Sequence, residues 1–160
     1  MRILSRDDER RCVVTERSPT LSMLSRKFGD RASHTWLCVI ISYYNELSSS
    51  SKKMEAFQIE ACASAIAFEY FYLKASEILL FFKLLLSGRF GKQVFGGLDP
   101  YTINSCIRES FLPLRAYHIE QDEREKRAAK RERMFMEAEH NPEKLDEYRN
   151  KLINKLKTNN

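Results

Sequence analysis

The chain has 160 residues, of which 43% are hydrophobic and 31% are charged, and its formal net charge is +5. Only 5 glycines and 4 prolines are present, which argues against a disordered chain and against an all-β fold with its many tight turns. The length fits one domain with an extension. The mild positive charge permits a nucleic acid or another anionic partner.

The first elements are predicted from short local signals. Residues 1–17 are charged and lack a regular apolar spacing, so we expect a loose arm. The tripeptide SPT at 18–20 is typical of a helix start, and GD at 29–30 ends this helix. A second helix is predicted over about 33–47, with its apolar residues on one face.

Two strongly apolar helices are predicted next. The first, over about 53–73, carries two apolar stripes, which predicts a central place in the core. The second, over 76–87, has Ser76 as its expected N-cap and Gly88 as the residue just beyond its C-terminus. The strongly apolar run over 76–87 also fits a buried strand, but its length and leucine content favour a helix.

A new helix is predicted to begin at Asp99 and Pro100, because an N-cap carboxylate there precedes proline at the first helical position. Pro113 should kink or interrupt this helix. Beyond it the sequence becomes charged. Three acid–base pairs then have the favourable (i, i+4) order: Glu120/Arg124, Asp122/Lys126 and Glu123/Arg127.

These elements predict an all-α fold, a compact bundle of about five helices with a charged C-terminal helical extension. The expected organisation is a loose charged arm over 1–17, a helical core domain over 18–114, and an extension over 115–160. The extension ends in an amphipathic helix that starts near Asn141 and Pro142.

No group of residues suggests catalysis. The four cysteines form no C-x-x-C pair, and the three histidines are scattered. Acids within the apolar region, Glu60, Glu69 and Glu77, show no sign of converging. We therefore expect no enzyme activity, no metal, no cofactor and no small-molecule ligand. The cysteines are interpreted as small buried side chains in a reducing compartment.

The chain also shows no membrane signal. The N-terminus lacks the apolar stretch of a signal peptide. The apolar run over 61–86 is interrupted by Glu69, Lys74, Glu77 and Lys83, which a membrane span tolerates poorly. We expect a cytoplasmic protein without membrane contact.

A glycine-rich basic loop is the first candidate binding site. The sequence SGRFGK at 87–92 contains G-x-x-G, whose backbone amides can face a phosphate while Arg89 and Lys92 add charge. Its spacing is not that of a nucleotide-binding P-loop, and the same residues also suit a helix end followed by a turn. Arg108 and Arg115, on the helix after the loop, would enlarge this basic patch.

A second basic group lies on the charged helix. Arg124, Arg127 and Arg131 are spaced by three and four residues, with Lys130 beside Arg131. A stripe of guanidinium groups suits a phosphate backbone, although a charge run of this kind is usually an ordinary solvated helix face. DNA or RNA is the ligand that either basic group would suit.

The amphipathic segment over 142–157 is a candidate for protein contacts. It can fold back on the core, pair with a second copy, or bind in a partner's groove. Its apolar side is formed by Leu145, Tyr148, Leu152 and Leu156.

Three stretches carry a family resemblance: RKFGD at 26–30, M-x-x-x-Q-I at 54–59, and FYLKASEILLFFKLLLSGRFGKQVFGGLDPYTI at 71–103. They resemble an uncharacterised family of small helical proteins carried on plasmids, conjugative elements and phages of gut anaerobic bacteria. The resemblance covers roughly residues 20–125. It implies a helical protein of a mobile element and brings no activity with it.

Two functions remain open from the sequence. The first is a non-enzymatic, nucleic-acid-associated accessory protein of a mobile genetic element, acting in replication or transfer. The alternative is an adaptor or inhibitor that binds a host or replisome protein through its C-terminal helices.

Overall fold

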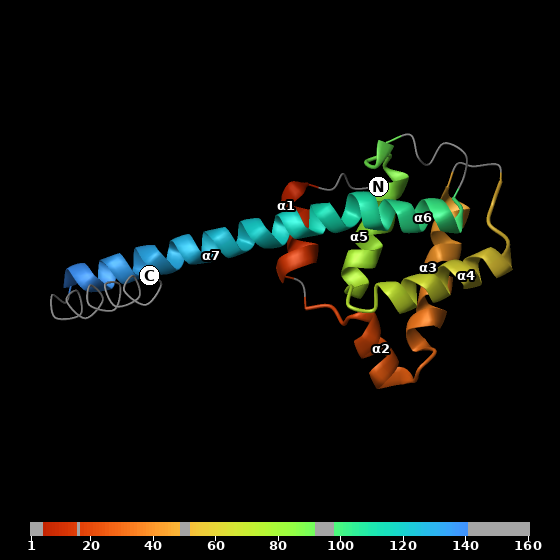
Figure 1. The fold of residues 1–160 in the computed structure, drawn as a ribbon, viewed down its shortest axis with the longest axis horizontal. Coiled ribbons are helices and arrows are strands. Elements are labelled where there is room, and N and C mark those ends of the chain that lie inside the picture. Colours follow the sequence, from red (N-terminus) through yellow and green to blue (C-terminus); the bar gives the residue numbers. More distant parts are fainter. Residues whose placement is uncertain (1–4, 16, 49–51, 92–97, 141–160) are drawn as a thin grey trace, which may run out of the picture. The chain divides into compact units, whose positions relative to one another are not determined.

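The computed structural model describes residues 5–15, 17–48, 52–91 and 98–140. Apart from one isolated bridge between Thr20 and Lys74, the regular elements in these residues are all helical. The predicted all-α fold is therefore confirmed (Figure 1). In chain order, the elements are α1 (Arg6–Arg10), η1 (Arg11–Thr15), α2 (Leu21–Phe28), α3 (Ala32–Leu47), α4 (Ala56–Glu69), α5 (Ala75–Leu86), α6 (Pro100–Cys106), η3 (Ile107–Phe111) and α7 (Leu112–His140).

The chain forms two compact units, Met1–Ile119 and Glu120–Asn160. The sequence places the start of the extension at residue 115, whereas the contacts place the division after Ile119. The difference arises because residues just beyond 115 still meet the core: His118 is buried and Ile119 packs against the core cluster.

The core of the first unit is built around α5, which lies in the middle of this unit (Figure 1). Of its 12 residues, Ile78, Leu80, Phe81, Phe82, Leu84 and Leu85 are buried large apolar side chains. Each of these contributes about 1.5–3 kcal/mol by leaving water. One face each of α3, α4 and the α6–η3 segment completes the same core cluster.

Aromatic rings connect α5 to its neighbours. Tyr44 of α3 stacks on Phe82 with the ring centroids 5.0 Å apart. Phe111 of η3 meets Phe81 edge-on at 5.6 Å. Offset and edge-to-face pairs of this kind add specificity to the burial energy, so they fix how α3 and η3 sit on α5.

The N-terminal residues differ from the expected loose arm. Residues 6–15 are helical, and the side chain of Ser5 caps α1 by accepting from the Asp8 backbone N–H at 3.1 Å. Val13 is buried, and its carbonyl accepts a hydrogen bond from Lys74 Nζ at 2.8 Å. The segment is too short to show an apolar period, because a single turn on each side of Val13 faces the core.

Backbone hydrogen bonds position α2 beside the start of α5. The Leu21 N–H donates to the Leu73 carbonyl, and the Ala75 N–H donates to the Pro19 carbonyl, both at 2.9 Å. Thr20 is the N-cap of α2, with its hydroxyl accepting from the Met23 N–H at 3.2 Å. The predicted helix start and its end at Gly29 are therefore both confirmed.

Pro113 acts as predicted, by interrupting regular helix. A proline lacks the N–H of an α-helical hydrogen bond and its ring collides with the preceding turn. The five residues Ile107–Phe111 form a π-helical turn, and the Leu112 N–H donates to the Ile107 carbonyl across it. The wider turn lets α7 begin directly before the proline.

One packing prediction is wrong. The two apolar stripes over residues 53–73 predict a helix buried on most sides, but only the stripe of Ile59, Cys62 and Ile66 is buried. Phe57 and Phe68 of the other stripe are exposed, Phe68 by 88%. Apolar composition alone does not tell whether a neighbouring helix is present to cover a face.

Candidate nucleic-acid interface

The glycine-rich loop ends α5. Gly88 has a φ of 73°, its N–H donates to the Leu85 carbonyl at 3.2 Å, and the Arg89 N–H donates to the Leu84 carbonyl at 3.1 Å. This pair of bonds is a Schellman motif with glycine at C′, as the helix-end interpretation predicts. The Gly91 N–H donates to the Gly88 carbonyl at 3.0 Å. Three amides of the loop are therefore satisfied by the chain itself, so they do not form a phosphate cradle.

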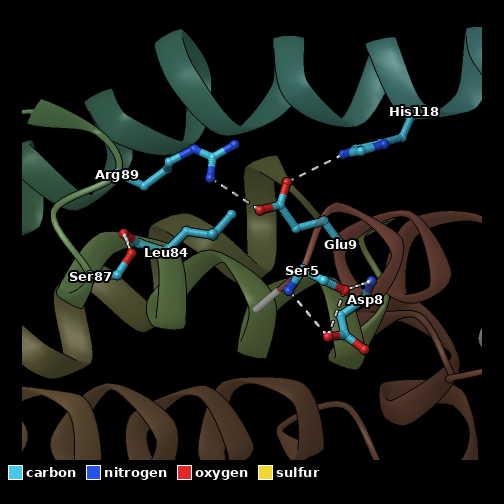
Figure 2. A network of polar contacts seen from close by, with 7 residues as sticks. All are labelled: Ser5, Asp8, Glu9, Leu84, Ser87, Arg89 and His118. Atoms are coloured by element: carbon cyan, nitrogen blue, oxygen red, sulfur yellow. Dashed lines mark hydrogen bonds and ion pairs between the residues drawn. The ribbon is translucent and has the colours of Figure 1, made fainter. Parts of the chain in front are cut away.

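The Arg89 side chain reaches a buried carboxylate. Figure 2 shows Glu9 of α1 between Arg89 and His118 of α7. Arg89 Nη1 lies 3.4 Å from Glu9 Oε1, and His118 Nε2 lies 3.5 Å from Glu9 Oε2. The Glu9 side chain is only 1% exposed, and a buried carboxylate is costly without a compensating cation. Part of the Arg89 charge is therefore engaged inside the first unit.

Arg115 is engaged in the same way. Its Nε donates to Glu77 Oε1 at 2.7 Å, and the Glu77 side chain is fully buried. The other oxygen, Oε2, accepts from the Lys74 backbone N–H at 2.8 Å, which caps α5. This cap replaces the predicted N-cap at Ser76. Arg115 also lies over the Tyr72 ring, 5.8 Å from its centroid.

The other two residues of the predicted loop patch give no more support. Arg108 is exposed and lies 3.4 Å from Glu109 Oε1, a weak surface pair. Lys92 lies outside the described residues. The structure thus does not gather Arg89, Arg108 and Arg115 around one anion site, and their binding to phosphate stays a prediction.

The second predicted basic group has a different character. Every residue from 124 to 133 is exposed. At about 100° of rotation per residue, all the cations of this segment fall in one half of the helix circumference. Glu125 and Glu132 fall in the other half, with Ala128 and Ala129. We call the cationic half the basic face; its residues are Arg124, Lys126, Arg127, Lys130, Arg131 and Arg133.

Ion pairs occupy only the first turn of the basic face. The three predicted (i, i+4) pairs are all present, with N–O distances of 2.6, 2.6 and 3.0 Å, and engage Arg124, Lys126 and Arg127. Exposed pairs of this kind contribute little, so they exchange readily for a phosphate. Lys130, Arg131 and Arg133 form no ion pair within the described part of the chain.

Sequence reasoning missed Lys126 and Arg133 as members of this face. In the sequence, Lys126 stands out only as the partner of Asp122, and Arg133 does not follow Arg131 at an interval of three or four residues. The rotation of about 100° per residue around the helix nevertheless places both side chains on the same half as the other cations.

Metal and thiol chemistry find no support in the described residues. No group of three or more His, Cys, Asp or Glu side chains there is placed to hold a metal ion. Burial raises the pKa of the Cys62 thiol to about 12 and also raises the pKa of Cys106. Thiols with raised pKa values are poor nucleophiles at neutral pH.

The predicted protein-contact residues cannot be placed in the fold. Leu145, Tyr148, Leu152 and Leu156 lie outside the described residues, as does the whole segment over 142–157. Among the described helices, none is both long and apolar enough to span a lipid bilayer.

The fold and the basic face define an all-α protein whose clearest surface feature is a cationic helix face. The chain belongs to a family of unknown function (DUF6633), whose model matches residues 53–159. The match includes α4 to α7, and therefore the basic face, and does not include α2 and α3. No curated protein and no solved structure was found to match the chain.

Proposed function

We propose that this protein is a non-enzymatic, nucleic-acid-associated protein that contacts the phosphate backbone through the basic face of α7. The observation that carries the proposal is the segregation of six cations on one half of an exposed helical segment, with both acids of that segment on the other half. Within this segment, the cations can therefore approach phosphates without bringing Glu125 or Glu132 against them.

The chemistry of the basic face favours binding without sequence specificity. Arginine and lysine bind phosphates through charge-assisted hydrogen bonds. The segment over 124–133 contains no Asn or Gln, the side chains that read adenine in the major groove, so base contacts there are limited to those that arginine and lysine make with guanine. Binding then rests on counterion release, which makes affinity steeply dependent on salt.

The setting of this activity is part of the proposal. The resemblance to small helical proteins of plasmids, conjugative elements and phages supports an accessory role in the replication or transfer of a mobile genetic element. A backbone-binding protein suits such a role, because it acts on any sequence that the element carries.

The experiment is a salt titration of binding to a short DNA duplex, read by fluorescence anisotropy. If all six cations contact phosphates, the slope of log K against log salt is about −5. The triple variant K130Q/R131Q/R133Q removes the three cations without ion pairs. It should make the slope shallower, reducing its magnitude by about 3.

A matched control removes the same charge elsewhere. The variant R26Q/K27Q/R31Q also removes three exposed cations, but from α2 and the turn after it. It should leave the salt slope unchanged. Binding that is absent at low salt, or that the two triple variants weaken equally, would refute the proposal.

A further inference from the structure

A hollow on the first unit lies between α2 and α3, and none of the residues discussed as phosphate contacts lines it. Its volume is about 850 Å³, and its apolar lining comes from Leu24 and Phe28 of α2 and from Trp36 and Val39 of α3. A second hollow of about 800 Å³ shares Leu24 and Phe28 and is otherwise lined by residues 17–19, 23, 26 and 27. We call the two hollows together the α2–α3 groove.

The groove exposes apolar side chains that a folded protein ordinarily covers. Phe28 is 66% exposed and Val39 is 62% exposed. Tyr43 and Leu47 follow Val39 at intervals of four residues on α3, and each is more than half exposed. This stripe runs about 12 Å along α3 at 1.5 Å per residue. A surface of this length suits an elongated occupant, and contiguous exposed apolar patches mark interaction sites.

The rim of the groove is strongly basic. Three cations line the second hollow, which contains no acidic residue, and Arg31 lines the first hollow together with Asp30. Lys27 lies over the Phe28 ring, 5.3 Å from its centroid. None of the four forms an ion pair with another residue in the described part of the chain. The rim cations are Arg17, Arg26, Lys27 and Arg31.

We propose that the α2–α3 groove binds an acidic amphipathic helix of a partner protein, whose apolar face covers Phe28, Trp36 and Val39 and whose carboxylates face the basic rim. An apolar floor selects apolar anchors at helical spacing, as in other helix-in-groove complexes. A mainly positive rim favours a partner with negative charge and steers the approach of that partner.

Charge separates this occupant from two others. The chain's own C-terminal segment, residues 141–160, has 5 Lys+Arg against 3 Asp+Glu, so it has the same sign as the rim. A nucleic acid would satisfy the cations, but it would leave Leu24 and Val39 facing polar base edges or sugars. The groove proposal concerns a different surface from the basic face. It can therefore be tested independently of the proposed nucleic-acid binding.

The test is a selection of displayed random peptides of about 16 residues, a helix length of about 24 Å, on the full-length protein. We expect the enriched peptides to be net acidic, with apolar residues at i, i+3 or i+4, and i+7. An enriched peptide is then labelled for anisotropy titrations. Its Kd should rise about tenfold or more with Phe28→Ala, as for a central anchor, and with R26Q/K27Q/R31Q.

Two controls make the result specific. Phe68→Ala removes an even more exposed ring from α4 and should leave the peptide Kd unchanged, as should K130Q/R131Q/R133Q. Circular dichroism checks that each variant keeps its helix content. The proposal is overturned if no peptides are enriched or if the enriched peptides are neutral or basic. It is equally overturned if Phe28→Ala has no effect, if an oligonucleotide competes for the groove, or if sedimentation shows self-association that depends on Phe28.

Discussion

Replacing Arg115 with methionine tests whether a buried ion pair holds α7 to α5. Arg115 Nε donates to Glu77 Oε1 at 2.7 Å, and Glu77 Oε2 accepts from the Lys74 N–H at 2.8 Å. The Glu77 side chain has no exposed surface. Methionine retains much of the aliphatic length of arginine, so R115M mainly leaves a buried carboxylate without its cation.

The expected loss follows from burial. Two unit charges about 4 Å apart attract by about 4 kcal/mol at an effective dielectric constant of 20. Removing one partner of a buried pair destabilises by about 3–5 kcal/mol. A quarter of the Arg115 side chain is exposed, so solvent screens part of this interaction. We expect R115M to lower the free energy of unfolding by about 3 kcal/mol.

A surface pair of similar length is the matched control. Arg124 Nη2 lies 2.6 Å from Glu120 Oε1, but both side chains are mostly exposed. R124M should therefore cost less than about 0.5 kcal/mol. The assay is urea unfolding followed by circular dichroism, in which the midpoint shifts while the m-value stays constant. Equal losses for R115M and R124M would show that burial does not decide the strength of these pairs.

Three further predictions concern local features. Gly88→Ala should cost about 1 kcal/mol in thermal unfolding, because a Cβ meets no atom there and only the positive φ is strained; an unchanged midpoint would contradict the Schellman geometry. Asp99→Ala should cost about 1 kcal/mol by losing the N-cap bond to the Thr102 N–H, while Asp99→Ser retains most of it. Burial raises the pKa of the folded Cys62 thiol to about 12, so this thiol loses its proton at a lower pH in the unfolded chain than in the folded chain. The free energy of unfolding should therefore fall by up to about 1.4 kcal/mol per pH unit above about pH 8.5. Urea midpoints measured against pH should show a shallower fall for Cys62→Ala, and identical slopes would refute this assignment.

The helix boundaries that sequence predicts well are those with local causes. Thr20 and Asp99 cap helices through their own side chains, and Gly29 and Gly88 end helices through a positive φ. Each signal acts within four residues, so it is visible in a short window of sequence. Residue type alone favours Ser76 as the cap of α5, but the N-cap is Lys74, whose backbone N–H donates to Glu77 Oε2, while Arg115 binds the other oxygen of Glu77.

The candidate site was less predictable, because a cation's availability depends on contacts distant in the chain. Nothing near Arg89 in the sequence indicates that Glu9 is buried beside it, and nothing near Glu9 indicates His118. Charge compensation of this kind needs the tertiary fold. The basic face differs because helical rotation alone sorts Lys130 and Glu132 onto opposite halves.

The two buried carboxylates explain why Arg89 and Arg115 differ from the exposed cations of α7. Glu9 and Glu77 lie on different helices, yet the first turns of α7 meet both, through His118 and Arg115. An arginine that compensates a buried carboxylate, as Arg115 does for Glu77, cannot leave it for an external phosphate without exposing the full cost of that burial. Beyond Ile119, by contrast, no described side chain of α7 whose exposure is defined is buried. Along α7, the change from a cation held by a buried carboxylate to exposed cations therefore falls where the contacts divide the chain, and net charge counted over the whole sequence could not reveal it.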